Sequence, residues 1–173
     1  GTELHLLAGE AELKERGADV VRTDRGGDIT FHGPGQLVGY PILDLHDYYL
    51  DLHRYLRDLE EVIIRLLAPY DIRGERMPEY TGVWVKGEKI CALGIRSSGW
   101  VTMHGFALNV DVDLAWFDRV VPCGLAGVRV TSMREQTRAS CDIGGVQDAL
   151  VRWFARAFEV EFVHAQAGAA VGD

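Results

Sequence analysis

The stretch "GVWVKGEKICALGIR", residues 82–96, carries the clearest indication of how this chain folds. Two runs of β-branched, aromatic and aliphatic residues flank a short polar segment at residues 86–88, which is typical of a β-hairpin and its turn. Strand alternation predicts that one face of the second strand carries every other side chain. The residues expected on that face are Lys89, Cys91, Leu93 and Ile95.

Further strand-type runs lie on both sides of this hairpin. "QLVGYPIL" (36–43) predicts a strand that Pro41 pushes toward a sheet edge or a strand end, because proline cannot donate to a ladder. "VTMHGFALNVDVDL" (101–114) predicts one strand or two. Shorter strands are predicted at "ADVVRTD" (18–24) and "VEFVHA" (160–165).

Helical periodicity is clearest between the strand predicted at residues 36–43 and the hairpin. Apolar residues recur at three- and four-residue steps up to Leu67, so we predict a long helix that Asp44 or Asp47 caps. A second helix is expected at about Gly145–Phe158 with Asp142 as its cap. A weaker helix is expected before a Gly17 C-cap, and residues 115–140 look irregular. Strands in the middle of the chain with helices outside them predict an α+β fold with a mixed or antiparallel sheet.

The bulk composition predicts one soluble-type domain. The chain has 173 residues, of which 47% are apolar and 25% charged, and the apolar residues form no run of the ~20 that a membrane helix needs. A net charge of −8 argues against a nucleic-acid partner. Three cysteines are too few for a disulfide framework, which favours a reducing cytoplasm.

The segment "RGGDITFHGPGQ" (25–36) holds four glycines around a short β-type run. Such a backbone can come very close to another group, because glycine has no side chain. It is not a nucleotide phosphate loop, since no Lys-Ser or Lys-Thr pair follows its glycines.

The three cysteines differ in what surrounds them. Cys123 lies in "VVPCGLAG", between a proline and a glycine, where nearby backbone N–H groups can lower a thiol pKa and bind an oxyanion. The same residue can equally be a small buried hydrophobe, and its local sequence leaves both readings open. Cys91, inside an apolar strand, favours core packing, and Cys141 favours an incidental position.

Lys89 opens the apolar run "KICALGIR". Taken alone it favours a solvated residue at the end of a strand, although a lysine beside a thiol would also favour the thiolate and shuttle protons. A zinc site of His32, His104 and Cys123 is conceivable, but no recognised zinc-ligand spacing supports it, and we predict no metal.

Taken together, four segments resemble the lipoyl(octanoyl) transferase family. They are "RGGDITFHGPGQLVGYPILDL", "KICALGIR", "HGFALNVDVDL" and "VPCGLAGVRVTSM", which occur in the family's order and spacing. The resemblance implies a biotin/lipoate protein ligase-like fold, related to class II synthetases, in which a mixed β-sheet packs with helices. It also leads us to expect a single catalytic domain over residues 1–173 that lacks an N-terminal segment of the family.

The resemblance also implies the activity and its residues. The family moves octanoyl from an acyl-carrier-protein thioester to a lysine of a lipoyl domain, with no cofactor. By motif match, Cys123 is the acyl-thioester nucleophile and Lys89 its basic partner. The implied substrate-binding residues are Arg25, Gly26, Gly27, Asp28, Ile29, Thr30, Phe31, His32, Ala92, Leu93, Gly94, Gly105, Phe106 and Ala107.

Elementary chemistry is consistent with this assignment. Thioester-to-thiol exchange is nearly balanced in energy, and a neutral lysine can take the proton of the acceptor amine. A glycine-walled slot would bury an eight-carbon chain at about 0.8 kcal/mol per methylene. Replacing Gly27 by valine or leucine should then raise KM for octanoyl donors more than for short donors.

The implied partners are octanoyl-acyl carrier protein as donor and lipoyl domains of 2-oxoacid dehydrogenases and the glycine cleavage H protein as acceptors. Acyl carrier protein is acidic, so a chain at −8 needs a local basic patch to dock it. Candidates for that patch are Arg22, Arg25, Lys86, Arg96, Arg129, Arg134 and Arg138. Three alternatives stay open: an ATP-dependent ligase, a cysteine hydrolase and a carrier-binding module.

Overall fold

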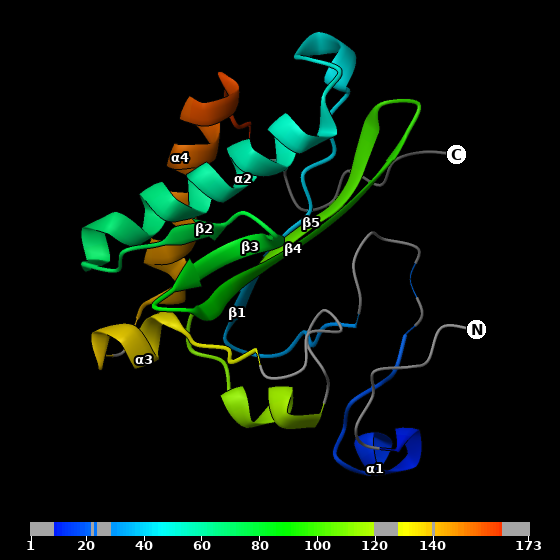
Figure 1. Cartoon of the computed structure of the whole chain (residues 1–173), viewed down its shortest axis with the longest axis vertical. Coiled ribbons are helices and arrows are strands. Elements are labelled where there is room, and N and C mark those ends of the chain that lie inside the picture. The colour runs from blue at the N-terminus through cyan, green and yellow to red at the C-terminus, as the bar shows by residue number, and fades with distance from the viewer. Residues whose placement is uncertain (1–8, 22, 24–28, 120–127, 140, 164–173) are drawn as a thin grey trace.

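A computed structural model describes residues 9–21, 23, 29–119, 128–139 and 141–163 of the chain. Its centre is a sheet of five strands in the order β1-β5-β4-β3-β2, and every pair of neighbouring strands is antiparallel (Figure 1). The strands are β1 (Gln36–Gly39), β2 (Glu75–Met77), β3 (Tyr80–Val85), β4 (Glu88–Ser98) and β5 (Val101–Asn109). A parallel element enters at one isolated bridge between Lys89 and Val130, so the mixed character of the sheet is confined to that point among the described residues.

Two long helices, α2 and α4, pack together over one face of this sheet (Figure 1). The helical elements are α1 (Glu10–Glu15), η1 (Leu45–Asp47), α2 (Leu52–Leu67), η2 (Ala68–Tyr70), η3 (Leu114–Arg119), α3 (Met133–Thr137) and α4 (Ile143–Phe158). The expected α+β class is therefore confirmed. The hairpin predicted at residues 82–96 is also confirmed, because β3 and β4 are joined by a turn at Lys86 and Gly87.

The main core lies between these two helices and the sheet. It takes apolar side chains from α2 such as Leu59 and Ile63, from α4 such as Phe154, and from the central strands such as Val83 and Leu108. A smaller cluster of Val112 and Phe117, with partly buried neighbours from the glycine-rich stretch, forms a separate core.

The long helix begins later than its periodicity predicted. Asp44 caps only the short η1 turn, and Tyr48 then leaves helical geometry with φ −124° and ψ −77°. Asp51 is the true N-cap of α2, and its side chain accepts from the Arg54 N–H at 3.0 Å. The cap expected for the last helix is confirmed, since Asp142 accepts from the N–H groups of Gly144 and Gly145.

Two predicted strands do not form in the described residues. The stretch at 18–24 is irregular where it is described, and so is the stretch at 160–163. Val21 is 76% exposed and Val163 is 91% exposed, although Val160 packs partly buried against the main core. A strand needs a ladder partner and a face to bury, and composition alone supplies neither.

The region predicted at residues 101–114 as one strand or two forms a single strand, which ends five residues early, at Asn109. The next two N–H groups, of Val110 and Asp111, both donate to the carbonyl of Gly35. Gly35 has φ +87°, and a Cβ there would lie 2.3 Å from the Asp111 carbonyl oxygen. One glycine of the glycine-rich stretch is therefore needed for close contact with the chain's own backbone.

Candidate active site

Lys89 does not share a face with Cys91, contrary to the alternation predicted for β4. Val83 pairs with Cys91 and Trp84 pairs with Lys89, so Ile90 is an extra residue on β4, a β-bulge. Ile90 and Cys91 both belong to the main core, with 0% exposure each. The bulge therefore turns Lys89 to the opposite face of the sheet, away from the core under α2 and α4.

On that opposite face lies a small hollow, here called the Lys89 hollow. Its lining residues are Thr30, Gln36, Lys89, Ala92, Asn109, Phe117 and Val130. They come from the glycine-rich stretch, from three strands, from η3 and from the segment after residue 127. Residues far apart in the sequence thus meet around one lysine.

Lys89 itself is 4% exposed, which is unusual for a lysine at the start of a strand. Its Nζ lies 4.6 Å from the centroid of the Trp84 ring, a favourable cation–π geometry. Gly82 makes room for its stem, because a Cβ there would lie 3.3 Å from Lys89 Cε. The expectation of a solvated strand-end lysine, which Lys89 taken alone favoured, is wrong.

The backbone of Lys89 joins β4 to the segment that follows residue 127. The Lys89 N–H donates to the Arg129 carbonyl at 2.9 Å, and the Lys89 carbonyl accepts from the Thr131 N–H at 3.0 Å. This segment continues the sheet beyond the end of β5 and brings Val130 to the hollow.

A chain of side-chain amides crosses one wall of the hollow. Gln36 and Asn109 are register partners on β1 and β5. The Gln36 Nε2 donates to the Asn109 Oδ1 at 2.8 Å, and the Asn109 Nδ2 donates to the Thr131 carbonyl at 3.0 Å. The Gly33 N–H donates to the Gln36 Oε1 at 3.3 Å. Sequence reasoning did not single out Asn109, whose signal was a polar residue at the end of an apolar strand.

The residues predicted to bind substrate divide between different places. Thr30 and Ala92 line the Lys89 hollow. Leu93 and Phe106 belong to the main core. Gly94 and Gly105 are register partners, and the Gly105 side of that pair is covered, since a Cβ there would lie 2.2 Å from the Gly39 carbonyl oxygen.

Other predicted site residues pack beside residues of the hollow or lie outside the described residues. Phe31 stacks on Trp116 at 5.2 Å between ring centroids and meets Phe117 edge-on at 5.7 Å. Ile29 packs with the same cluster, and Ala107 is 3% exposed on β5. The residues that fall outside the described part are Arg25, Gly26, Gly27, Asp28 and Cys123.

Of the cysteines, Cys91 is a core residue, as predicted. Burial raises the pKa of its thiol, an effect that the charge of Lys89 only partly opposes. Cys141 is half-buried, with its Sγ 3.8 Å from the Thr137 Oγ1. Within the described residues neither thiol lines the hollow, so Cys123 stays the predicted nucleophile.

The histidines considered for zinc have other contacts. His32 is exposed, and its Nδ1 lies 3.2 Å from the Gln36 Oε1. His104 has φ +63° and meets the Tyr40 ring edge-on. The described residues contain no group of three or more His, Cys, Asp or Glu side chains arranged to hold a metal ion.

The basic patch expected for docking is partly neutralised where it is described. Arg129 pairs with Glu88 at 3.2 Å, and Arg134 pairs with Asp111 at 2.8 Å. Lys86 and Arg138 are exposed, while Arg22 and Arg25 lie outside the described residues. The patch stays a prediction.

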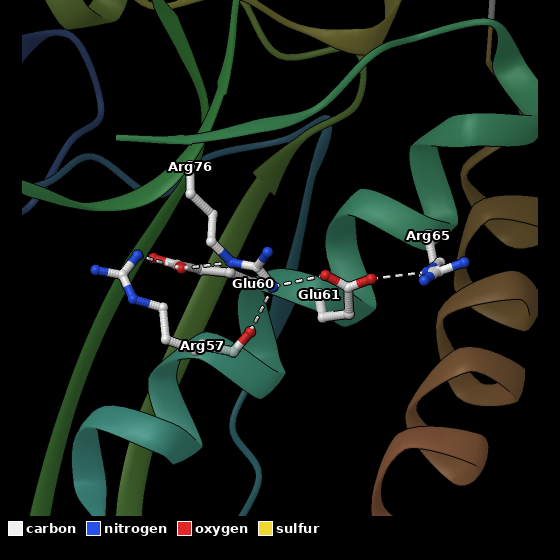
Figure 2. Close-up of polar contacts among 5 residues, drawn as sticks. All are labelled: Arg57, Glu60, Glu61, Arg65 and Arg76. Atoms are coloured by element: carbon white, nitrogen blue, oxygen red, sulfur yellow. Dashed lines mark hydrogen bonds and ion pairs between the residues drawn. The ribbon is translucent and has the colours of Figure 1, made fainter. Parts of the chain in front are cut away.

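A charged cluster joins α2 to β2, as Figure 2 shows. Glu60 is 0% exposed and pairs with Arg57 at 2.7 Å and with Arg76 at 3.3 Å. Its Oε1 also accepts the Gly82 N–H at 3.0 Å. The Gly82 N–H is therefore bound by Glu60, and the Lys89 stem lies close to where a Gly82 side chain would be.

The fold is that of the solved lipoate and biotin protein ligases. Lipoate-protein ligase A bound with ATP matches with a TM-score of 0.74 at 17% identity, covering 92% of this chain and 66% of that one. A bi-partite lipoate protein ligase of Thermoplasma acidophilum, from a structural analysis of that ligase and its E2 lipoyl domain, matches with a TM-score of 0.73 at 18% identity over 96% of this chain and 69% of that chain. The biotin protein ligase of Aquifex aeolicus gives a TM-score of 0.58 at 17% identity over 72% and 53% of the two chains.

Sequence relatives narrow the class further. Residues 2–155 match the lipoyl protein ligase A/B catalytic domain family. The octanoyltransferase of Rubrobacter xylanophilus is 56% identical over 151 residues, which cover 87% of this chain and 67% of that protein. The octanoyltransferase of Christiangramia forsetii is 48% identical over 167 residues, or 93% and 71% of the two chains. This chain belongs to the octanoyltransferases of the lipoyl protein ligase A/B family, as its motifs predicted.

Family membership makes the protein an acyltransferase. The chain spans about two thirds of the length of the two octanoyltransferases compared above. None of the helices in the described part of the chain combines the length and the apolar character needed to cross a membrane.

Proposed function

We propose that this protein transfers an octanoyl group from acyl carrier protein to a lysine of a lipoyl domain, through a thioester on Cys123. The single observation that best supports this proposal is the buried Lys89. A β-bulge directs its side chain to the hollow on the face of the sheet opposite Cys91. A lysine is costly to bury, so its place beside an open hollow argues for a chemical role.

The chemistry has two balanced halves. The Cys123 thiolate attacks the carbonyl carbon of the donor thioester, a new C–S bond forms, and the carrier's C–S bond breaks with release of the carrier thiolate, which takes up a proton. The acceptor lysine amine then attacks the enzyme thioester, forms an amide and releases the Cys123 sulfur. Lys89 favours the thiolate when charged and accepts the amine's proton when neutral. No net oxidation or hydrolysis occurs.

Chain connectivity supports the pairing of Lys89 with Cys123. Arg129 is hydrogen-bonded to the Lys89 backbone and follows Cys123 by six residues. A chain of that length spans at most roughly 20 Å even when fully extended. This tether is short enough to allow Cys123 to pair with Lys89, whereas Cys91 on the same strand faces the core.

The octanoyl chain, in this proposal, enters from the mouth of the Lys89 hollow. Thr30 and Ala92 would line its path, and the aromatic cluster of Phe31 and Phe117 supplies apolar surface beside it. Residues Arg25–Asp28 and the strand backbones at 92–94 and 105–107 complete the predicted acyl site. Burial of the chain would contribute about 0.8 kcal/mol per methylene.

The proposed acceptors are the lipoyl domains of 2-oxoacid dehydrogenases and the glycine cleavage H protein. A ligase of the same fold is described together with its own E2 lipoyl domain, which supports a lipoyl domain as the kind of acceptor. We place the reaction in the cytoplasm, because a nucleophilic thiol has to stay reduced.

One experiment tests the proposal. The enzyme is mixed with octanoyl-acyl carrier protein and an apo lipoyl domain, and the intact masses of all three proteins are followed. We expect a transient gain of one octanoyl group on the enzyme and a lasting gain on the lipoyl domain. Cys123→Ala should abolish the enzyme adduct and Cys91→Ala should preserve it. The opposite pattern would refute the assignment.

A second candidate is an ATP-dependent ligase, because lipoate-protein ligase A bound with ATP shares the fold. Formation of an acyl-adenylate from octanoate and ATP, with no adduct from octanoyl carrier protein, would favour it. Release of free octanoate without an acceptor would indicate a hydrolase instead. Full transfer by a variant without any cysteine would refute the thioester intermediate.

A further inference from the structure

The side-chain amides of Gln36 and Asn109 have a fixed orientation, because both ends of their chain are backbone groups. At one end the Gly33 N–H can only donate, so the atom that receives it is the Gln36 Oε1. At the other end the Thr131 carbonyl can only accept, so the atom that reaches it is the Asn109 Nδ2. Turning both amides around would place two donors together at Gly33 and two acceptors together at Thr131.

The same orientation fixes His32. Its Nδ1 lies 3.2 Å from the Gln36 Oε1, an acceptor, so Nδ1 carries the proton in the neutral ring. Gln36 therefore accepts from two donors of the glycine-rich stretch, at His32 and Gly33. This holds the Gln36 carboxamide between that stretch and β5.

Each amide nitrogen has two N–H groups, and only one of them is used. The Gln36 Nε2 donates to Asn109, and the Asn109 Nδ2 donates to Thr131. The second N–H of each amide has no acceptor within the part of the chain that the structure describes. Both residues line the Lys89 hollow, and Asn109 is only 4% exposed. A buried donor without an acceptor calls for a ligand or a bound water.

We propose that these two N–H groups bind the carbonyl oxygen of the acyl thioester beside Lys89. This rests on the proposed function and adds to it a substrate-binding role for Gln36 and Asn109. When the thiolate attacks, the carbonyl oxygen becomes an oxyanion, and the two amide donors would stabilise that charge more than the neutral carbonyl. The oxyanion collapses as the carrier's C–S bond breaks.

A different role would be purely structural, because the amides also tie β1 to β5 and to the segment at Thr131. The two roles differ in what they affect. A carbonyl-binding pair affects acyl transfer to Cys123 but leaves its alkylation by iodoacetamide unchanged, since displacement of iodide creates no oxyanion. A structural defect would change both reactions.

The test uses neutral variants of matched shape, Gln36→Met and Asn109→Leu, in the full chain. Gln36→Met leaves the Asn109–Thr131 bond intact, so it serves if Asn109→Leu does not fold. Gln136→Met is the control. The Gln136 Nε2 donates to the Thr131 Oγ1 at 2.9 Å, but Gln136 does not line the hollow. The rates of Cys123 octanoylation by octanoyl carrier protein and of Cys123 alkylation are measured by intact mass.

We expect each of the two variants to slow octanoylation by roughly 10²–10³-fold, the usual effect of losing an oxyanion donor. Alkylation should stay within about twofold of the parent enzyme, and Gln136→Met should leave both rates unchanged. Equal slowing of both reactions, or octanoylation at the parent rate, would overturn the inference. If the parent enzyme forms no octanoyl adduct, the proposed function fails first and the inference fails with it.

Discussion

Lys89 and Cys91 are two positions apart on β4, yet they face opposite sides of the sheet. Ile90 is the extra residue of a β-bulge, so the strand's alternation is interrupted between them. Cys91 is buried in the main core, whereas Lys89 lies at the hollow beside Trp84. The bulge separates the Cys91 thiol from the lysine's amine, so the nucleophile proposed to work with Lys89 is another residue.

Lys89→Met tests the electrostatic role of this amine while keeping most of the apolar stem over Gly82 and Trp84. We expect slower alkylation of Cys123 by iodoacetamide near neutral pH, because a nearby ammonium favours the thiolate. The rate should fall by about tenfold for each unit by which Lys89 lowers the thiol pKa. Lys86→Met, at the exposed turn before β4, is the control, and equal rates for the two variants would remove the role.

Gly82→Ala tests whether the space under the Lys89 stem is required. A Cβ at Gly82 would lie 2.8 Å from the Cys91 carbonyl oxygen and 3.3 Å from Lys89 Cε, at a φ of +134°. Gly87→Ala is the matched control, since φ there is +81° but nothing lies within 4 Å. The control should cost about 1–2 kcal/mol of unfolding free energy from backbone strain alone.

Gly82→Ala should cost about 1–3 kcal/mol more than that control, from the added crowding. It should also slow octanoyl transfer, because the lysine stem has to move. Urea unfolding and the transfer rate provide the two measurements. Equal stability of the two variants would show that the Gly82 site relaxes without strain.

Glu60 and Glu61 form a matched pair of carboxylates in the cluster of Figure 2. Glu60 is fully buried and accepts from two arginines and the Gly82 N–H, whereas the Glu61 side chain is 35% exposed and pairs with Arg65 and Arg76. Glu60→Ala should cost about 1–3 kcal/mol of unfolding free energy, because it leaves the buried Gly82 N–H without its acceptor.

Glu61→Ala should cost under about 1 kcal/mol, as exposed ion pairs do. Urea unfolding at neutral pH compares the two variants directly. If Glu61→Ala lowers the unfolding free energy as much as Glu60→Ala does, the bond from the Gly82 N–H to Glu60 contributes nothing special to stability.

Alkaline pH should lower the free energy of unfolding, because the thiol of Cys91 and the phenol of Tyr55 are buried. Burial raises the pKa of the Cys91 thiol above its ordinary 9.0, and burial likewise raises the pKa of the Tyr55 phenol above 10.0. In the unfolded chain both groups ionise near their ordinary values, so the unfolded state binds fewer protons there and stability falls as pH rises. The slope approaches about 1.4 kcal/mol per pH unit for each group.

Urea unfolding between pH 7 and pH 10.5 measures this decline. Cys91→Ala should remove the part that begins near pH 9, while the part due to Tyr55 begins about one unit higher. A flat profile for the parent protein would contradict the buried, protonated state of Cys91. Native protein should also resist alkylation at Cys91 until it unfolds.

Local patterns predicted much of the fold. The hairpin followed from two apolar runs around Lys86 and Gly87, and α4 followed from its periodicity and its Asp142 cap. The strands predicted at 18–24 and 160–165 do not form in their described residues, because a strand depends on partners that its own residues cannot supply. The start of α2 was misplaced because Asp44 and Asp51 are both good caps, and Tyr48 interrupts the helix between them.

The family motifs identified Lys89, Thr30 and Ala92, which the fold brings to one hollow. They gave no sign of Asn109 or Gly82, whose importance comes from neighbours in distant strands. Trp84 was read as one more apolar strand residue, yet it carries the Lys89 amine over its ring.

By itself, the sequence determined the family, the fold class and the identity of the residues proposed for catalysis, because these are encoded in local motifs and their order. Only the tertiary structure decided which face of β4 carries Lys89 and which amide N–H groups remain for a substrate. A bulge depends on how two strands pair, and an unused donor depends on every neighbour within hydrogen-bond reach. Neither property belongs to any single stretch of the chain.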